Sequence, residues 1–196
     1  MEIDVLRHAL SERTPQRRTR PKVAAVLVPI IQSSDGLHLL LTRRADTLSS
    51  HRGEVAFPGG GVEPADQSLV ETALREATEE VALPSERVEV LGQLDDFPTL
   101  GDRTIVTPIV GLINGFPELH PEPAEVARIF TIPIAELEKS DGWTIRSYSQ
   151  RGHDFPVFYF DWDGETLWGL SAYITLQLLS LNEGGGPCEL PPPYGP

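Results

Sequence analysis

Residues 59–81 constrain this 196-residue chain more than any other segment. They open with Gly59-Gly60-Gly61, which lack Cβ atoms and therefore let the backbone lie close to a ligand or to a helix. Ser68-x-x-Glu71 follows as a capping-box pattern, directly before a run with helical spacing of apolar residues. The sequence therefore predicts a tight glycine turn that leads into a helix from about Leu69 to Val81.

The predicted helix carries three carboxylates on one side. At about 100° per residue, Glu76, Glu79 and Glu80 fall within about a third of its circumference. A separate apolar stripe is predicted from four residues: Val70, Leu74, Ala77 and Val81. Neighbouring carboxylates repel one another, whereas a hard divalent cation such as Mg²⁺ prefers oxygen ligands and makes the arrangement favourable. We therefore predict the three glutamates as metal ligands, with Arg75 holding Glu79 by a charge-assisted hydrogen bond.

Strand patterns alternate with helical patterns along the rest of the chain. Apolar runs bounded by turn residues predict strands at 23–32, 37–42, 54–57, 88–94, 105–113 and 155–160. Helical or partly helical segments are predicted at 2–13, 132–137 and 168–181. Strands interleaved with two long helices predict an α/β fold, a single mixed sandwich.

We expect three parts in the chain. Residues 1–21 are predicted to form an N-terminal helix and a proline-bracketed basic connector, interpreted as a solvated linker. Residues 22–182 form the folded domain. Residues 183–196 hold four glycines and five prolines and are expected to be a flexible tail.

Charge and composition exclude several classes of protein. Sixteen basic against 29 acidic side chains give a net charge of −13, which argues against nucleic acid as a partner. The single cysteine, Cys188, excludes an intramolecular disulfide framework. No apolar run reaches the roughly 20 residues that span a bilayer. We therefore expect a cytoplasmic protein with no membrane partner.

The helix and its glycine turn resemble the Nudix box, in which a glycine precedes a glutamate by six residues and Arg-Glu-apolar-x-Glu-Glu-x-Gly-apolar follows. Three further segments are similar to the coenzyme A pyrophosphatase branch of that family: Leu40-Leu41-Thr42-Arg43-Arg44-Ala45, Gly53 with Phe57-Pro58-Gly59-Gly60, and Trp168-Gly169-Leu170-Ser171-Ala172. The resemblance covers roughly residues 22–181. It implies a Nudix-like α/β/α sandwich with a mixed β-sheet, and it leaves a homodimer open.

The chain departs from the family pattern at three places. The sixth position after Gly61 is Gln67 where the box has glutamate, and counting from Gly60 it is Asp66. Ala82 stands where the box usually has glycine. Ser49 stands where the branch signature has an arginine, which in that position contacts a substrate phosphate.

The resemblance implies hydrolysis of a diphosphate linked to another moiety, with Mg²⁺ or Mn²⁺ as cofactor. Coenzyme A or a derivative would be cleaved to adenosine 3′,5′-bisphosphate and 4′-phosphopantetheine. Arg75, Glu76 and Glu79 are the expected catalytic residues, and either Glu76 or Glu79 is the general base.

Further residues are predicted to contact the substrate. Side-chain alternation along a strand sends Arg43 and Arg44 to opposite faces, so we expect at most one of them to reach phosphate. His51, Gly60 and Arg103 are further candidates, and Glu125 is the candidate for an additional carboxylate.

Two other functions stay open. Ser49 motivates ADP-ribose or NADH as the substrate in place of coenzyme A. The missing first glutamate of the box motivates a non-catalytic domain that binds a nucleotide.

Overall fold

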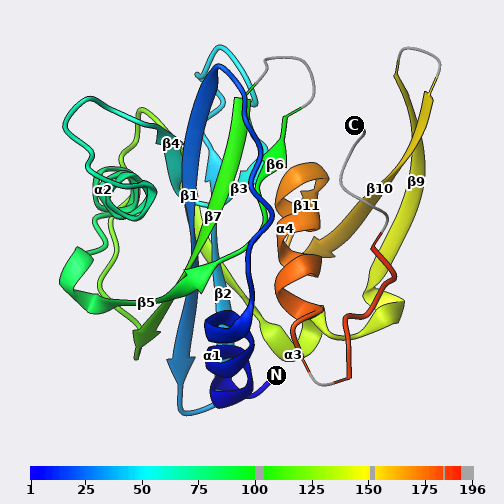
Figure 1. Ribbon diagram of the computed structural model, residues 1–196. Coiled ribbons are helices and arrows are strands. Elements are labelled where there is room, and N and C mark those ends of the chain that lie inside the picture. The colour runs from blue at the N-terminus through cyan, green and yellow to red at the C-terminus, as the bar shows by residue number, and fades with distance from the viewer. Residues whose placement is uncertain (100–103, 151–152, 183, 191–196) are drawn as a thin grey trace.

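The computed structural model describes residues 1–99, 104–150, 153–182 and 184–190, and it consists of two sheets with helices packed between and beside them (Figure 1). The large mixed sheet has the order β3-β2-β1-β7-β5, with β4 beside β1, β6 beside β7 and β8 beside β2. Its strands are β1 (Lys22–Ser33), β2 (Gly36–Arg44), β3 (Val55–Ala56), β4 (Gly59–Gly61), β5 (Val88–Gln93), β6 (Phe97–Pro98), β7 (Thr104–Asn114) and β8 (Val126–Pro133). Among the described strands, β1 and β7 alone pair in parallel, so the sheet is mixed as predicted.

The small sheet is antiparallel and has the order β11-β10-β9. It consists of β9 (Trp143–Gln150), β10 (His153–Trp162) and β11 (Glu165–Trp168). The helices are α1 (Ile3–Glu12), α2 (Leu69–Val81), α3 (Ile134–Leu137) and α4 (Gly169–Leu179), with 3₁₀ turns η1 (Ser85–Arg87) and η2 (Ser140–Gly142).

Two apolar clusters fill the two sides of the large sheet. On one side Ala73, Ala77 and Val81 of α2 pack with Leu27 and Ile109 of the sheet. On the other side α1, α4 and the small sheet form a larger cluster, and Figure 1 shows α4 between the two sheets, opposite α2. This three-layer arrangement confirms the predicted α/β/α sandwich.

The structure confirms α2 with the predicted bounds and corrects several other predictions. The glycine segment, expected as a turn, is strand β4, in which Gly59, Gly60 and Gly61 pair with residues 24–26 of β1. The sequence analysis missed β9 and β11, because polar residues interrupt both segments and no apolar run marks them.

The basic connector is bound to the domain. Asp95 Oδ1 accepts hydrogen bonds from Arg13 Nη2 and from the Gln16 N–H, both at 2.8 Å. Buried Asp96 accepts one from the Arg18 N–H at 2.9 Å and one from Thr107 Oγ1 at 2.7 Å. The connector is therefore anchored to the domain through its backbone, while most of its residues are exposed to solvent as expected.

In the tail, Cys188 and Leu190 are partly buried and pack against the larger apolar cluster. Residue 183 and residues 191–196 of the predicted flexible tail lie outside the described residues. None of the described helices combines the length and the apolar composition that crossing a bilayer requires.

Strand β4 provides a matched test of close packing. An alanine Cβ at Gly59 would lie 2.5 Å from the Ala25 carbonyl oxygen and 2.6 Å from Val26 Cα, both backbone atoms, whereas one at Gly61 would meet nothing within 4 Å. Gly59→Ala should therefore lower the free energy of unfolding by about 1–3 kcal/mol. Gly61→Ala should leave it nearly unchanged. Urea unfolding of both variants checks this, and equal stabilities would contradict the tight β1–β4 contact.

Candidate active site

The N-terminus of α2 is fixed by the predicted capping residues. The Ser68 side chain accepts a hydrogen bond from the Glu71 N–H at 3.2 Å. The Glu71 carboxylate in turn accepts one from the Gln67 N–H at 2.7 Å. These bonds satisfy N–H groups that a helix start leaves without partners, so they fix where the helix begins.

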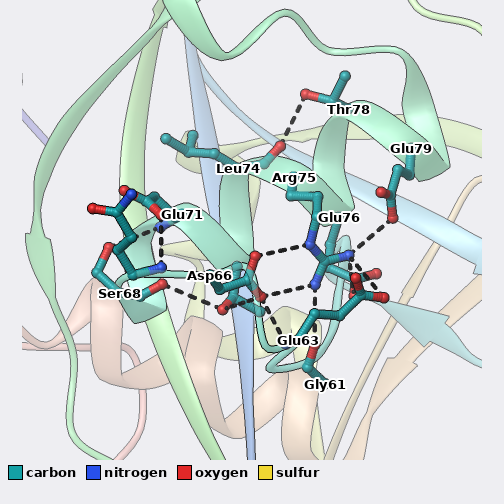
Figure 2. Close-up of polar contacts among 12 residues, drawn as sticks. Gly61, Glu63, Asp66, Ser68, Glu71, Leu74, Arg75, Glu76, Thr78 and Glu79 are labelled. Atoms are coloured by element: carbon teal, nitrogen blue, oxygen red, sulfur yellow. Dashed lines mark hydrogen bonds and ion pairs between the residues drawn. The ribbon is translucent and has the colours of Figure 1, made fainter.

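Arg75 binds four groups around the start of the helix (Figure 2). Its Nε and Nη2 donate to the two carboxylate oxygens of Asp66 at 3.0 and 3.1 Å. Nη2 also donates to the Gly61 carbonyl at 3.0 Å. Nη1 donates to Glu76 and to Glu79, each at 3.0 Å. The planar guanidinium thus ties β4, the following loop and two of the predicted metal ligands together.

Asp66 is the acid that pairs with Arg75. This pairing favours counting the box from Gly60, which gives Asp66 as the sixth residue, over counting from Gly61, which gives Gln67. The Asp66 side chain is 4% exposed and also accepts from the Glu63 N–H and from Thr72 Oγ1, at 2.8 and 2.9 Å. The hydrogen bonds from Arg75 hold the pKa of Asp66 well below its usual range. Gln67, the other candidate position, contributes its backbone N–H to the cap.

The three glutamates of α2 differ in environment more than the helical wheel predicts. Side-chain exposure is 59% for Glu79 and 14% for Glu76, while Glu80 is buried beside Ala77 and Val81. Of the four residues in the predicted apolar stripe of α2, Ala77 and Val81 are fully buried and Val70 and Leu74 are not. The reason is that α2 lies on the sheet mainly through Ala73, Ala77 and Val81. One carboxylate of the trio therefore points into the protein.

Burial raises the pKa of two of these carboxyl groups. It raises the pKa of Glu80 to about 7, although the charge of Arg44 and the Gly59 N–H act in the opposite direction. Burial also raises the pKa of Glu76, against the effect of Arg75. The negative charge of Glu125 contributes to both shifts, so Glu125 lies within electrostatic range of Glu76 and Glu80, where the sequence analysis expected an additional carboxylate.

Strand β4 passes directly under these carboxylates. A Cβ at Gly60 would overlap the Glu76 carboxylate, so only glycine allows this approach. Ala82 ends the helix in a left-handed conformation at φ 56°, and its N–H bonds back to the carbonyls of Ala77 and Thr78. The missing box glycine is thus replaced by an alanine that adopts the same kind of cap.

The donor chemistry of the site fits a hard divalent cation. Within the described residues, no three acidic, histidine or cysteine side chains already lie close enough together to hold a metal ion. Glu76, Glu80 and Glu125 are nevertheless oxygen donors whose charges disfavour one another, and a cation relieves that repulsion. Arg75 binds Glu76 through Oε1 and Glu79 through Oε2, so it takes only one oxygen of each carboxylate.

The two arginines at the end of β2 have different surroundings, as alternation predicts. Arg43 Nη2 donates to Asp46 at 2.8 Å, and its Nε lies 3.7 Å from Glu165. Arg44 lies near Glu80, and its Nε is buried with no hydrogen-bond partner among the described residues. Arg44 is therefore the arginine that lies near Glu80 with an Nε donor left without a partner in the part of the chain that the structure describes.

A pocket of about 530 Å³ adjoins the carboxylates and shares Arg44 and Gly59 with them. His51 lies at this pocket with a left-handed φ of 54°, and its Nδ1 is 2.9 Å from Glu54 Oε2. Arg103, the remaining predicted contact, lies outside the described residues. The apolar wall of the pocket, contributed by β9, β10, β11 and α4, was not predicted, because those residues are far from the box in the sequence.

Known proteins of one family match most of this chain in sequence. The family model described as NUDIX domain matches residues 21–151. "Uncharacterized Nudix hydrolase NudL" of Photorhabdus laumondii is 47% identical over 155 residues, which are 79% of this chain and 82% of that protein. The protein of the same name from Yersinia enterocolitica is 43% identical over 79% of this chain and 78% of its own length. Among solved structures, the NUDIX domain of Shewanella oneidensis NrtR complexed with ADP ribose is 20% identical, covers 66% of this chain and 83% of that chain, and has a TM-score of 0.47.

The Asp66–Arg75 pair predicts a specific pH dependence of stability. The pKa of Asp66 is lower in the folded than in the unfolded protein, where it is about 3.9. The charge pair therefore stabilises the fold at a pH above about 3.9, and this stabilisation is lost as the pH falls through the pKa of the folded state. Asp66→Asn should therefore lower the melting temperature by a few degrees at pH 7, measured by calorimetry in EDTA. Its deficit relative to the wild type should shrink as the pH falls below about 4.

The exposed Asp141 on η2 offers a matched control. Asp141→Asn should melt like the wild type at every pH. A deficit of Asp66→Asn that is constant down to the acid limit would show that the loss does not come from this charge pair.

Proposed function

This chain belongs to the NUDIX family and is a Nudix hydrolase, and we propose that it cleaves the diphosphate of coenzyme A or its derivatives with Mg²⁺ or Mn²⁺. The products of coenzyme A would be adenosine 3′,5′-bisphosphate and 4′-phosphopantetheine. Sequence similarity to the coenzyme A pyrophosphatase branch motivates the choice of substrate.

One observation carries this proposal. The third segment that resembles the coenzyme A branch lies more than a hundred residues after the other two in the sequence, yet all three contribute to the pocket beside the carboxylates. Arg44 comes from the first, Phe57 and Gly59 from the second, and Trp168, Gly169, Leu170 and Ser171 from the third. Residues shared with that branch thus surround one ligand-sized space next to the predicted metal ligands.

The polar groups at the inner end of the pocket fit a diphosphate. The Arg44 guanidinium is the group we assign to a phosphate oxygen, because Arg44 lines the pocket and its Nε has no partner among the described residues, whereas Arg43 binds Asp46. Arg75 already binds Asp66 through two nitrogens, so it serves to hold Glu76 and Glu79 in place. Glu76, Glu79 and Glu80, with Glu125 as an additional carboxylate, are the residues that would hold the cation.

The reaction adds the oxygen of water to one phosphorus and breaks its bond to the bridging oxygen. When bound, the divalent cation neutralises substrate charge and makes water easier to deprotonate. A carboxylate must accept the proton of the attacking water, and Glu76 and Glu79 are the candidates. His51, at the outer part of the pocket, is assigned to contact the substrate away from the reacting phosphorus.

Glu80→Gln tests the role of the buried carboxylate. The kcat should fall about a hundredfold or more, the scale expected when a group that stabilises transition-state charge is removed. The melting temperature should stay the same or rise, because the variant replaces a buried carboxylate by a neutral amide of the same size. Glu86→Gln, at an exposed glutamate of η1, is the control and should keep full activity. Full activity of Glu80→Gln would exclude this residue from the metal site.

A substrate panel tests the coenzyme A assignment. Coenzyme A, ADP-ribose and NADH are compared by kcat/KM, with the products identified by mass. Turnover should require added Mg²⁺ or Mn²⁺, stop on chelation, and be most efficient with coenzyme A. Preference for ADP-ribose or NADH would favour the alternative suggested by Ser49. Nucleotide binding by calorimetry without hydrolysis of any compound would favour the non-catalytic alternative.

A further inference from the structure

The three tryptophans of this chain have different surroundings. Trp143 is buried and donates its Nε1–H to the Leu137 carbonyl at 2.8 Å. Trp162 is half-buried and donates to the Thr131 carbonyl at 3.2 Å. Trp168, at the end of β11, is 37% exposed and lines the pocket beside the carboxylates. Packing explains why Trp143 and Trp162 are buried or half-buried, but it does not explain why Trp168 is exposed at the pocket.

A stack of side chains on the small sheet holds Trp168 in place. Its indole lies parallel to the Tyr159 ring, with the centroids 6.0 Å apart and an interplanar angle of 3°. The Arg146 guanidinium lies 4.5 Å from the centroid of that same tyrosine ring. The register of β10 with β11 sets this order, because Tyr159 is the direct partner of Trp168. Trp168 thus lines the pocket while its indole is held parallel to the Tyr159 ring.

The rest of the pocket wall is also suited to a flat, uncharged group. Val26 and Phe57 line it from the large sheet, and Val157, Leu170 and Ile174 line it from the small sheet and α4. Arg44 and Gly59, the residues shared with the carboxylates, lie along the same pocket. A ligand with a diphosphate at Arg44 can thus place an attached planar ring among apolar side chains.

We propose that Trp168 is a stacking platform for the nucleobase of the substrate, and so a specificity-determining residue of this enzyme. The inference rests on the proposed function for the presence of a nucleotide. A base that stacks on an indole gains contact over its whole face, and a side chain already ordered by Arg146 and Tyr159 loses little conformational freedom on binding. A flexible aliphatic arm has no flat face and would gain nothing from the parallel orientation of the Trp168 and Tyr159 rings.

Tryptophan fluorescence tests the proposal in the presence of Mg²⁺, without any need for turnover. ADP should quench the emission, because its adenine contacts an indole. Pyrophosphate, which has no base, and 4′-phosphopantetheine, which has an aliphatic arm, should not quench it. Trp168→Phe should lose the quench and keep part of the ADP affinity measured by calorimetry. Trp168→Leu should bind ADP about tenfold more weakly, with pyrophosphate affinity unchanged.

Trp162→Phe is the matched control, because this indole lies outside the pocket-lining residues and the variant should keep both the quench and the affinity. Quenching by 4′-phosphopantetheine in place of ADP, no quench at millimolar ADP, or wild-type ADP affinity in both Trp168 variants would overturn the proposal. Hydrolysis of coenzyme A by the wild type with any of these results would leave the proposed function standing. Adenine binding at Trp168 without hydrolysis of coenzyme A would support the stacking role of Trp168 and contradict the proposed function.

Discussion

The Arg75 guanidinium is the interaction on which the candidate site depends. The chain has 13 more acidic than basic side chains, and the start of α2 concentrates four carboxylates within reach of this one cation. Its bonds to both oxygens of Asp66 and to the Gly61 carbonyl connect the helix to β4. Because β4 is also paired with β1, the guanidinium fixes the helix relative to the large sheet. A lysine, with a single nitrogen, could not make these contacts together.

The close contact of β4 with α2 places a carboxylate in a buried position, and other groups offset the free-energy cost of burying it. Glu80 is buried, which disfavours its charged form, and the Gly59 N–H and Arg44 counteract this effect. Backbone groups after α2 complete the arrangement: the N–H groups of His120 and Glu122 bond to the carbonyls of Val81 and Glu80, at 3.1 and 2.8 Å. The same segment brings Glu125 within electrostatic range of the helix. The carboxylates therefore converge through tertiary contacts that the helix alone does not make.

These contacts mark the limit of prediction from the sequence. The bounds of α2 were predictable because Ser68 and Glu71 cap it locally. Alternation predicted different surroundings for Arg43 and Arg44, and these are observed, although the pairing of β2 with β8 shifts register between the two residues. Counting alone could not decide between Asp66 and Gln67, since the answer depends on how the loop turns toward Arg75. It also could not show that Glu80 is buried, because the segment that covers it is about forty residues away. Strand β9 was missed because its polar residues follow no recognisable period.

The site is thus built from two parts with different origins. Strand β4 and α2 supply the carboxylates, the Arg75 hub and the glycine contact, all within 23 residues of sequence. Part of the pocket wall comes instead from β9, β10, β11 and α4, of which β9 lies within the segment matched by the family model and the other three follow it. Under the proposed function, the first part acts on the diphosphate that all candidate substrates share. Discrimination among those substrates then has to come from the second part, where a change at Trp168 or Tyr148 alters the ligand-facing surface without touching the carboxylates.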